Sequence, residues 1–226
     1  YYHTVLLHDE ECEQIFLPSP FDREHLDLYV HHGISTKYKQ RDQTLAPLIS
    51  TIYQVTRNQQ GNYLVFFPSY QYLEMVYEAY KELIDDEQRL LKQEREMDES
   101  AREAFLDSFQ DNSSENLVAF AVLGGVFSEG IDIIGNLLIG SIIVGVGLPQ
   151  INPLTEQRRL YFEEAFKKGY LYAYLYPGFN KVMQAVGRVI RTEEDKGVVI
   201  MIDERYIEPT YLSLFPYEWQ HAKFLK

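Results

Sequence analysis

The sequence predicts an α/β fold in which helices cover both faces of a parallel β-sheet. Four short runs are almost wholly apolar, as is typical of parallel strands that are covered on both faces. They are residues 63–67, 117–123, 141–146 and 198–202. The segments between them repeat apolar residues at helical spacing, and alternating strands and helices produce a parallel sheet. With no internal repeat or low-complexity linker in the sequence, one domain over residues 1–226 is the simplest organisation.

Amphipathic segments that are predicted to be helices connect these strands. They are residues 45–57, the segment that follows Ser69, a segment opened by the capping-box pattern Ser100-x-x-Glu103, and residues 154–168. Ser69 is expected to cap its helix. In the last of these helices, Leu160, Tyr161 and Ala165 are expected to point inward.

Other segments give weaker signals. Residues 4–7 and 14–17 read as two opening strands, whereas residues 86–97 show no clear period. Tyrosines at 172, 174 and 176 alternate with leucine and alanine. Such rings can stack on nucleic-acid bases, but we favour packing because aromatic side chains bury large areas.

Composition narrows the class of protein. The chain is 46% hydrophobic and 24% charged, an ordinary globular composition that can bury a sizeable core. The single cysteine, Cys12, excludes an internal disulfide and any multi-cysteine metal site within this chain. It agrees with a reducing compartment, and we expect a cytoplasmic bacterial protein. Residues 133–155 carry no charged side chain. Their strongly apolar part, residues 137–148, is shorter than the roughly 20 residues that a membrane span needs.

The net charge of −13 argues weakly against a nucleic-acid partner, because such domains are usually basic on the binding face. Much of the acidity is local, however. Residues 78–111 hold twelve acidic and five basic side chains, which reads most simply as a solvated helical face. A binding groove elsewhere can therefore still be positive.

Residues 182–191 carry the strongest pattern in the chain. On a helix, Gln184, Gly187, Arg188 and Arg191 fall at i, i+3, i+4 and i+7 and share one face. The opposite face is apolar and is expected to pack on the core: Val182, Val186 and Val189, flanked by Ala185 and Ile190.

Two arginines on one face suit a polyanion such as a triphosphate, because each guanidinium can bond two oxygens. Glycine costs about 1 kcal/mol inside a helix, so Gly187 suggests the close approach of a ligand or a neighbouring backbone. The alternative is a surface helix whose arginines pair with the acids that follow: Glu193, Glu194 and Asp195.

The pattern Q-x-x-G-R-x-x-R resembles motif VI of superfamily 2 helicases, and residues 180–205 resemble the version found in the XPD and DinG helicases. Two further stretches agree in the same order: GGVFSEGIDI at 124–133 resembles motif V, and YLVFFPSYQYLEMV at 63–76 resembles the motif IV region. The resemblance implies the second, C-terminal motor domain of such a helicase. Its fold would be a RecA-like, P-loop NTPase-type sheet over residues 1–226, with an initial segment at 1–42.

The resemblance assigns roles at the nucleotide. Arg188 and Arg191 would reach the γ-phosphate across a cleft, with Gln184 placing the phosphate or the attacking water. Motif V would line the same cleft, so the residues on the nucleotide-binding side would be Glu129, Gly130, Asp132 and Gly187.

Taken alone, Glu129 and Asp132 could bind a metal, act as acid and base, or orient arginines. They make a poor metal site, since nothing nearby in the sequence completes the shell. The resemblance favours contact with the ribose or with the motif VI arginines.

A second set of residues would contact single-stranded DNA. Ser69 and Tyr70 stand where the DNA passes in the family, although capping alone would also explain the serine. In the segment STKYKQRD, basic residues that include Lys37 and Arg41 surround Tyr38, a mixture that can grip a backbone and stack a base. A solvated connection into the next helix is the simpler interpretation of that segment.

The chain lacks the G-x-x-x-x-G-K-[ST] loop that cradles phosphates and any DEAH-type box. ATP with Mg²⁺ would therefore be bound mainly by the first motor domain, and any iron–sulfur cluster would lie elsewhere in the full chain. Because the sequence starts at Tyr1, we expect a piece cut out at the N-terminal edge of this domain.

The function that follows is half of an ATP-dependent DNA helicase, moving 5′ to 3′ by resemblance, and inactive as an isolated chain. Its partners would be single-stranded DNA and the first motor domain, with no membrane. The alternative is a non-enzymatic RecA-like module for protein docking or passive strand binding. Asp203 and Arg205 end the last predicted strand in a D-x-R pattern that the family shares, and no role follows from the sequence.

Overall fold

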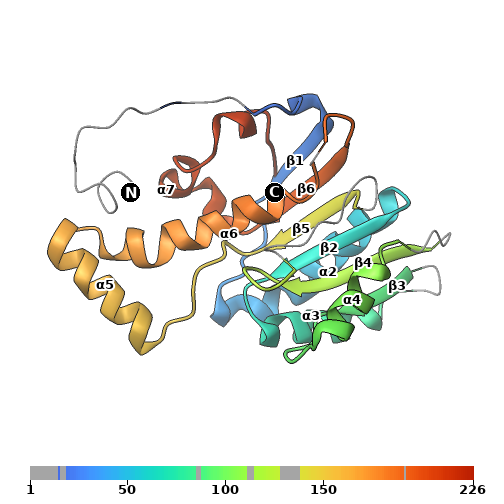
Figure 1. Cartoon of the computed structure of the whole chain (residues 1–226), viewed down its shortest axis with the longest axis horizontal. Helices are drawn as coiled ribbons and strands as arrows, with labels where there is room; N and C mark the ends of the chain where they lie inside the picture. The colour runs from blue at the N-terminus through green and yellow to red at the C-terminus, as the bar shows by residue number, and fades with distance from the viewer. Residues whose placement is uncertain (1–14, 16–18, 85–87, 111–114, 128–137, 191) are drawn as a thin grey trace.

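A parallel sheet of seven strands forms the centre of the structure, in the order β3-β4-β2-β5-β6-β1-β7 (Figure 1). The computed structural model describes residues 15, 19–84, 88–110, 115–127, 138–190 and 192–226. All six strand pairings are parallel, which confirms the predicted fold class. The strands are β1 (Leu26–His31), β2 (Asn62–Phe67), β3 (Gln88–Lys92), β4 (Asn116–Val122), β5 (Gly140–Val144), β6 (Gly197–Ile202) and β7 (Lys223–Leu225).

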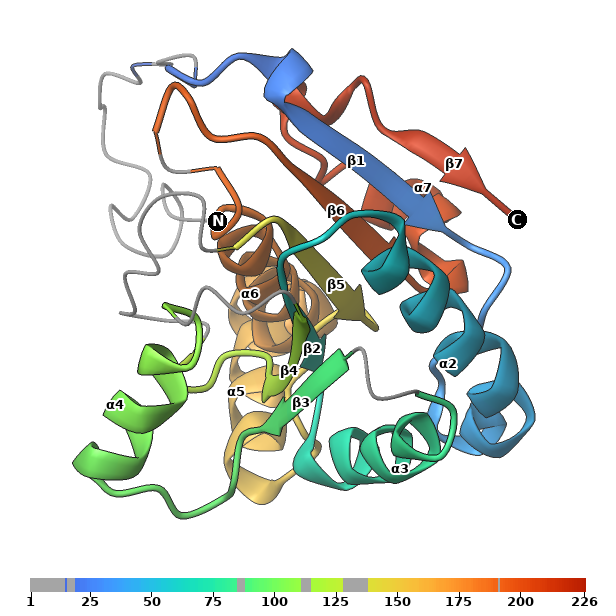
Figure 2. The same ribbon diagram turned by 90° about the vertical axis from the view of Figure 1, so that its right-hand side faces the viewer.

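Helices cover both faces of this sheet (Figure 2). The α-helices are α2 (Arg41–Asn58), α3 (Tyr70–Lys81), α4 (Glu99–Asp107), α5 (Pro153–Phe166), α6 (Tyr176–Val186) and α7 (Pro209–Leu212). The short helices are η1 (Arg23–His25), η2 (Tyr38–Gln40), η3 (Leu171–Leu175), η4 (Glu204–Ile207) and η5 (Tyr217–Trp219).

The core has two layers because successive strand side chains point to opposite faces. In β2, Val65 and Phe67 pack with buried residues of α2 and α3, whereas Leu64 and Phe66 pack with those of α4, α6 and α7. Buried strands of this kind explain why the apolar runs in the sequence do not alternate. The four predicted strands all form, as β2, β4, β5 and β6.

Three strands were not predicted: β1, β3 and β7. β1 was missed because Asp27 and His31 interrupt its apolar residues, and only Leu28 and Val30 are buried. β3 lies in the charged stretch to which no structure was assigned. The predicted strands at 4–7 and 14–17 lie outside the described residues, apart from Ile15, which is exposed and not in a strand.

The helix boundaries needed two corrections. Asp98, not Ser100, caps α4, and its carboxylate accepts the N–H of Ala101 at 2.8 Å. α5 ends at Phe166, with Lys167 as a left-handed C-cap, whereas the predicted helix ran to residue 168. Ser69 caps α3 as predicted, accepting the N–H of Tyr72 at 3.3 Å.

The inward face predicted for α5 is wrong. Leu160, Tyr161 and Ala165 are exposed, because α5 lies at the periphery and packs mainly against η3 rather than on the sheet (Figure 1). In that contact, Phe162 and Phe166 pack against Tyr172 at ring-centroid distances of 5.5 and 5.8 Å. The packing interpretation of the tyrosine segment is thus confirmed for Tyr172 and Tyr174, which are both buried.

The loop after β5 lies directly against the start of α6. Gly147 has a φ of +70°, and a Cβ placed on it would overlap the carbonyl oxygen of Gly178 in α6. Only glycine combines this left-handed backbone with so close an approach. The pair therefore fixes where α6 begins at the end of β5.

We predict that Gly147→Ala lowers the free energy of unfolding by at least about 2 kcal/mol, from left-handed strain and overlap with Gly178. Urea denaturation of the 226-residue chain measures the change. Gly187→Ala is the matched control, because Gly187 has a helical φ of −67° and its added Cβ would make only ordinary contacts. That variant should stay within about 1 kcal/mol of the wild type, and equal losses in both would contradict the interpretation.

Candidate functional site

The predicted site residues fall at two opposite edges of the sheet. α6 starts where β5 ends and runs back along the sheet, so its last turn lies beside the amino ends of the strands (Figure 1). There, the side chain of Val189 packs over Gly197, the first residue of β6. Gln184, Gly187 and Arg188 therefore belong to the amino edge, whereas Ser69, Tyr70 and Lys37 follow strand ends at the carboxyl edge.

The predicted helix at 182–191 ends earlier than expected. α6 stops at Val186, and Gly187 is its C-terminal cap, with its N–H donating to the carbonyl of Met183 at 3.0 Å. Gly187 and Arg188 thus lie in the turn after the helix, and only Gln184 is on the helix itself. Arg191 lies outside the described residues.

The environment of Gly187 differs from the prediction of close approach. Within the described part of the chain, a Cβ at Gly187 would meet the carbonyl oxygens of Met183 and Gln184 at 3.5 and 3.6 Å, which are ordinary contacts. Gly187 is exposed, as is Gln184. No described neighbouring backbone requires the glycine, and its exposed face is available to a ligand.

The apolar side of this segment behaves as predicted. All five residues are at most 7% exposed: Val182, Val186, Val189, Ala185 and Ile190. They pack in the core layer that also contains α4 and α7. This packing fixes the position of the turn that carries Arg188.

Among the acids after the motif, Asp195 is buried and serves the turn itself. Its carboxylate accepts the N–H of Thr192 at 2.8 Å. Glu193 and Glu194 are exposed. This bond gives Asp195 a structural role that does not depend on pairing with the motif VI arginines.

At the carboxyl edge, Tyr70 is the first residue of α3 and is half-buried. Its hydroxyl accepts a hydrogen bond from the Gln93 side chain at 2.8 Å, and the Arg95 guanidinium lies 5.5 Å from its ring centroid. Burial raises the pKa of the Tyr70 hydroxyl above its ordinary value.

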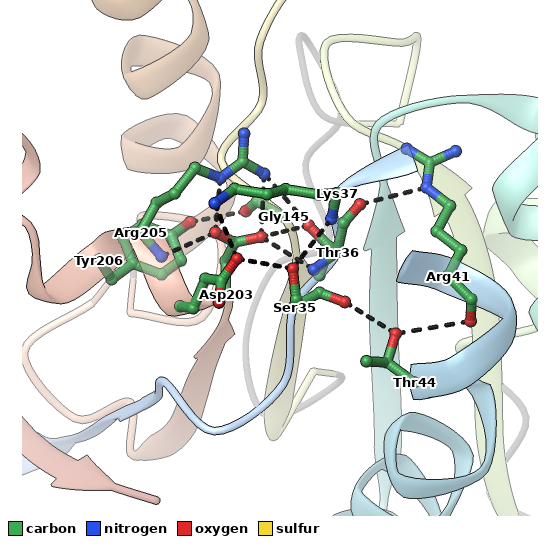
Figure 3. A network of polar contacts seen from close by, with 10 residues as sticks. Ser35, Thr36, Lys37, Arg41, Thr44, Gly145, Asp203, Arg205 and Tyr206 are labelled. Atoms are coloured by element: carbon green, nitrogen blue, oxygen red, sulfur yellow. Dashed lines mark hydrogen bonds and ion pairs between the residues drawn. The ribbon is translucent and has the colours of Figure 1, made fainter. Parts of the chain in front are cut away.

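The basic segment before α2 is anchored to η4, which follows β6 (Figure 3). The Lys37 ammonium pairs with Glu204 at 2.8 Å, and this bond raises the pKa of Lys37. Arg41 donates from Nε to the carbonyl of Thr36 at 3.2 Å and lies 4.0 Å above the Tyr72 ring. Both cations thus have internal partners, while Tyr38 between them is 71% exposed.

The D-x-R pattern, whose role could not be predicted from the sequence, forms the centre of this network. Asp203 is fully buried, and Arg205 donates to its two oxygens from Nε at 2.6 Å and Nη2 at 2.9 Å. The Thr36 hydroxyl and N–H both donate to Asp203 Oδ2, the latter at 3.2 Å. Burial would raise the pKa of Asp203, but the hydrogen bonds and charge of Arg205 hold it below its ordinary value.

Tyr206 extends the network to a third strand. Its hydroxyl donates to the carbonyl of Gly145, just after β5, at 2.7 Å (Figure 3). Burial raises the pKa of this tyrosine well above its ordinary value. We call Thr36, Asp203, Arg205 and Tyr206 the carboxyl-edge clasp, because they join the ends of β1, β5 and β6.

The motif V region is only partly described. Gly124 follows β4, and the aliphatic part of Lys181 in α6 packs against it. The predicted residues Glu129, Gly130 and Asp132 lie outside the described residues. Among the residues that are described, no three histidine, cysteine or acidic side chains come together as a metal site. In that same part of the chain, no helix is long and apolar enough to cross a membrane.

The sheet is open and parallel, and α6 runs back along it so that the turn with Arg188 lies at the amino edge. This arrangement is an α/β domain of the RecA-like type. The solved structure of apo XPD superposes with a TM-score of 0.70 at 19% identity, covering 89% of this chain and 40% of that one. The C-terminal domain of the DEAD-box protein Dbp5 gives a TM-score of 0.50 at 16% identity, covering 90% and 91%. These similarities confirm the fold.

Residues 52–222 match the helicase C-terminal domain family, and the chain belongs to that family. Its relatives include the ATP-dependent DNA helicase DinG of Photobacterium profundum, 30% identical over 198 residues, with 86% of this chain and 28% of the relative covered. A probable ATP-dependent helicase of Methanocaldococcus jannaschii is 27% identical over 220 residues, with coverage of 91% and 33%. The chain thus spans a third or less of the length of these relatives.

The clasp leads to a stability prediction. Arg205→Ala leaves the Asp203 carboxylate buried without its main partner and should cost about 3–5 kcal/mol of unfolding free energy. Arg159→Ala is the control, because the 2.9 Å Arg159–Glu156 pair is partly exposed and should contribute at most about 1 kcal/mol. Urea denaturation at neutral pH measures both losses, and similar values would contradict the role of the clasp.

The Asp203 carboxylate also makes the free energy of unfolding depend on pH. A lowered folded pKa means that Asp203 stabilises the fold above its unfolded pKa of about 3.9. This stabilisation is lost as pH falls through the lower, folded value. Without Arg205, burial raises the folded pKa of Asp203, so protonation in acid relieves the buried charge of Arg205→Ala while it removes stabilisation from the wild type. The difference in unfolding free energy between the two proteins should therefore shrink as pH falls from neutral toward about 3, and a difference that does not change with pH would contradict this role.

Proposed function

We propose that this chain is the C-terminal motor domain of an ATP-dependent DNA helicase of the DinG and XPD type. The proposal is supported by family membership and by the names of the relatives. The observation that carries it is the end of α6, where an exposed glycine cap precedes Arg188 at the amino edge of the sheet. A helix end that is fixed by buried valines can hold a guanidinium in one place for a phosphate.

The chemistry proposed for this edge is electrostatic. Arg188 and Arg191 would stabilise the charge that develops on the γ-phosphate during transfer, and arginines in that role contribute about 10³–10⁵ in rate in other enzymes. Gln184, exposed one turn earlier, would place the phosphate or the attacking water. Glu129, Gly130 and Asp132 of motif V, together with Gly187, would complete this side of the nucleotide cleft.

The first motor domain would supply the phosphate-binding loop and the acid that holds Mg²⁺. This chain has no such loop in its sequence, so its own residues act on a nucleotide that is bound across the cleft. Any iron–sulfur cluster would likewise belong to another part of the full protein.

The opposite, carboxyl edge is proposed to carry single-stranded DNA, with Ser69 bonding a phosphate and Tyr70 contacting a base. Ligands gather at this edge in open α/β sheets. Arg41 remains a candidate because its two terminal nitrogens point away from the Thr36 bond (Figure 3). Lys37 would have to share its ammonium between Glu204 and a phosphate. Translocation from 5′ to 3′ is our proposal from resemblance.

Arg191→Lys in the full-length protein tests the catalytic role. Lysine keeps the charge but loses the planar fork, so DNA-stimulated ATP hydrolysis should fall at least tenfold, about 1.4 kcal/mol. The loss should appear in kcat, with DNA affinity and Tm nearly unchanged, because the interaction forms in the transition state.

Arg158→Lys is the matched control, since Arg158 is exposed on α5, and it should leave the rate within about twofold of the wild type. Near-normal hydrolysis by Arg191→Lys would remove Arg191 from the catalytic residues.

A further prediction concerns the isolated chain, which should hydrolyse no ATP with or without single-stranded DNA, because it has no phosphate-binding loop. Steady-state phosphate release measures this. Turnover that disappears in Arg188→Ala would show that the chain is catalytic by itself and would contradict the division of labour proposed here.

A further inference from the structure

Gln93 is a buried polar side chain at the carboxyl end of β3, and it is 5% exposed. Its Oε1 accepts the N–H of Val122 at 2.8 Å, and its Nε2 donates to the Tyr70 hydroxyl at 2.8 Å. Its own N–H donates to the carbonyl of Phe120 at 2.8 Å. The side chain therefore continues the hydrogen bonding between β3 and β4 past the last paired residue, and it uses its remaining donor on Tyr70.

This amide joins two turns that are far apart in the sequence. Tyr70 opens α3 in the motif IV region, and Val122 ends β4 immediately before the motif V turn. A Cβ on Gly125, in that turn, would lie 3.3 Å from Gln93 Nε2. Gln93 thus contacts both the residue proposed to meet a base and the turn that leads to the nucleotide cleft.

The groove beside Tyr70 and the Gly124 turn carry different charges. An open groove of about 940 Å³ runs beside Tyr70 between α3 and the segment after β3. Four of its lining residues are acidic: Glu74, Glu78, Glu94 and Glu96. Lys92 pairs with Glu74 at 2.7 Å, and Arg95 stacks on Tyr70. Phosphates are disfavoured in this groove, whereas at the Gly124 turn, which does not line the groove, the described side chain in contact is the cationic Lys181.

We propose that Gln93 is a positioning residue for single-stranded DNA. It fixes the Tyr70 side chain against the Gly124–Gly125 turn, so that a base and its neighbouring phosphate meet a preformed site on the Gly124 side. The proposal rests on the proposed function, and it adds the residue that holds the motif IV turn and the motif V turn as one unit.

The test uses Gln93→Met in the full-length helicase, because methionine keeps the chain length and loses both side-chain hydrogen bonds. ATP hydrolysis is measured against the concentration of a dT oligonucleotide. The half-saturating concentration should rise about fivefold or more, the effect of losing a fixed contact, while the maximal rate stays within about twofold.

Gln88→Met is the matched control. Gln88 lies at the other end of β3, is 7% exposed, accepts from the Tyr80 hydroxyl at 2.8 Å and donates to Thr56 Oγ1 at 3.0 Å. Gln88 is thus a buried glutamine of the same strand with hydrogen-bond partners of the same kind as those of Gln93. Unlike Gln93, it does not lie at the carboxyl edge. This variant should lower Tm by a comparable amount and leave the half-saturating DNA concentration within about twofold.

Tyr70→Phe provides a second measurement that leaves the Val122 bond intact. Like Gln93→Met, it should raise the half-saturating DNA concentration. The double variant of Tyr70→Phe and Gln93→Met should show no larger increase than Gln93→Met alone. Equal shifts in the Gln93 and Gln88 variants, with a DNA-stimulated wild type, would overturn this inference alone. A wild type without DNA-stimulated hydrolysis would overturn the proposed function and this inference with it.

Discussion

The buried carboxylate of Asp203 is the constraint on which the carboxyl edge depends. A charge without solvent exposure costs several kcal/mol unless it is paired and hydrogen-bonded, and here Thr36 and Arg205 supply the donors. Because Thr36 follows β1 and Asp203 follows β6, the pairing joins the segments that leave these two neighbouring strands, whose ends are already level through the His31–Ile202 pair. Tyr206 extends the constraint to the end of β5 through Gly145. Three adjacent strands thus present their following loops at one height.

The clasp also determines where the basic segment lies. Ser35 donates to Glu204 at 2.8 Å, and Lys37 pairs with the same carboxylate, so the chain between β1 and α2 is held against β6. Arg41 then reaches the ring of Tyr72 in α3, beside the cap formed by Ser69. The residues proposed for DNA contact are therefore connected through internal pairs, and each pair limits the freedom of the cation that it holds.

Periodicity predicted the fold because each buried strand and each helix on the sheet must show it locally. It failed where the tertiary setting decides. The apolar residues of α5 are exposed because that helix packs on η3 and not on the sheet, which no spacing within the helix reveals. The clasp could not be predicted from the sequence for a different reason: Thr36 and Asp203 are 167 residues apart in the chain.

The motif VI segment, residues 182–191, contains one correct and one wrong prediction. Its valines predicted the buried face correctly, because α6, unlike α5, packs on the sheet. The helix itself was extended too far, because Gly187 was interpreted as an interior glycine although glycine is the common residue at a helix end. The correction changes the chemistry: Arg188 stands in a turn and takes its direction from the cap, not from a helical face.

α6 is the element that connects the two edges. Its first turn is pressed against Gly147, Lys181 lies on Gly124 beside the motif V turn, and its cap presents Arg188 at the far end. Eleven residues at about 1.5 Å each span roughly 16 Å, the depth of the sheet along its strands. Because the buried face of α6 packs on the core along its whole length, one rigid contact surface determines both where the helix meets Gly147 and where its cap places the turn with Arg188.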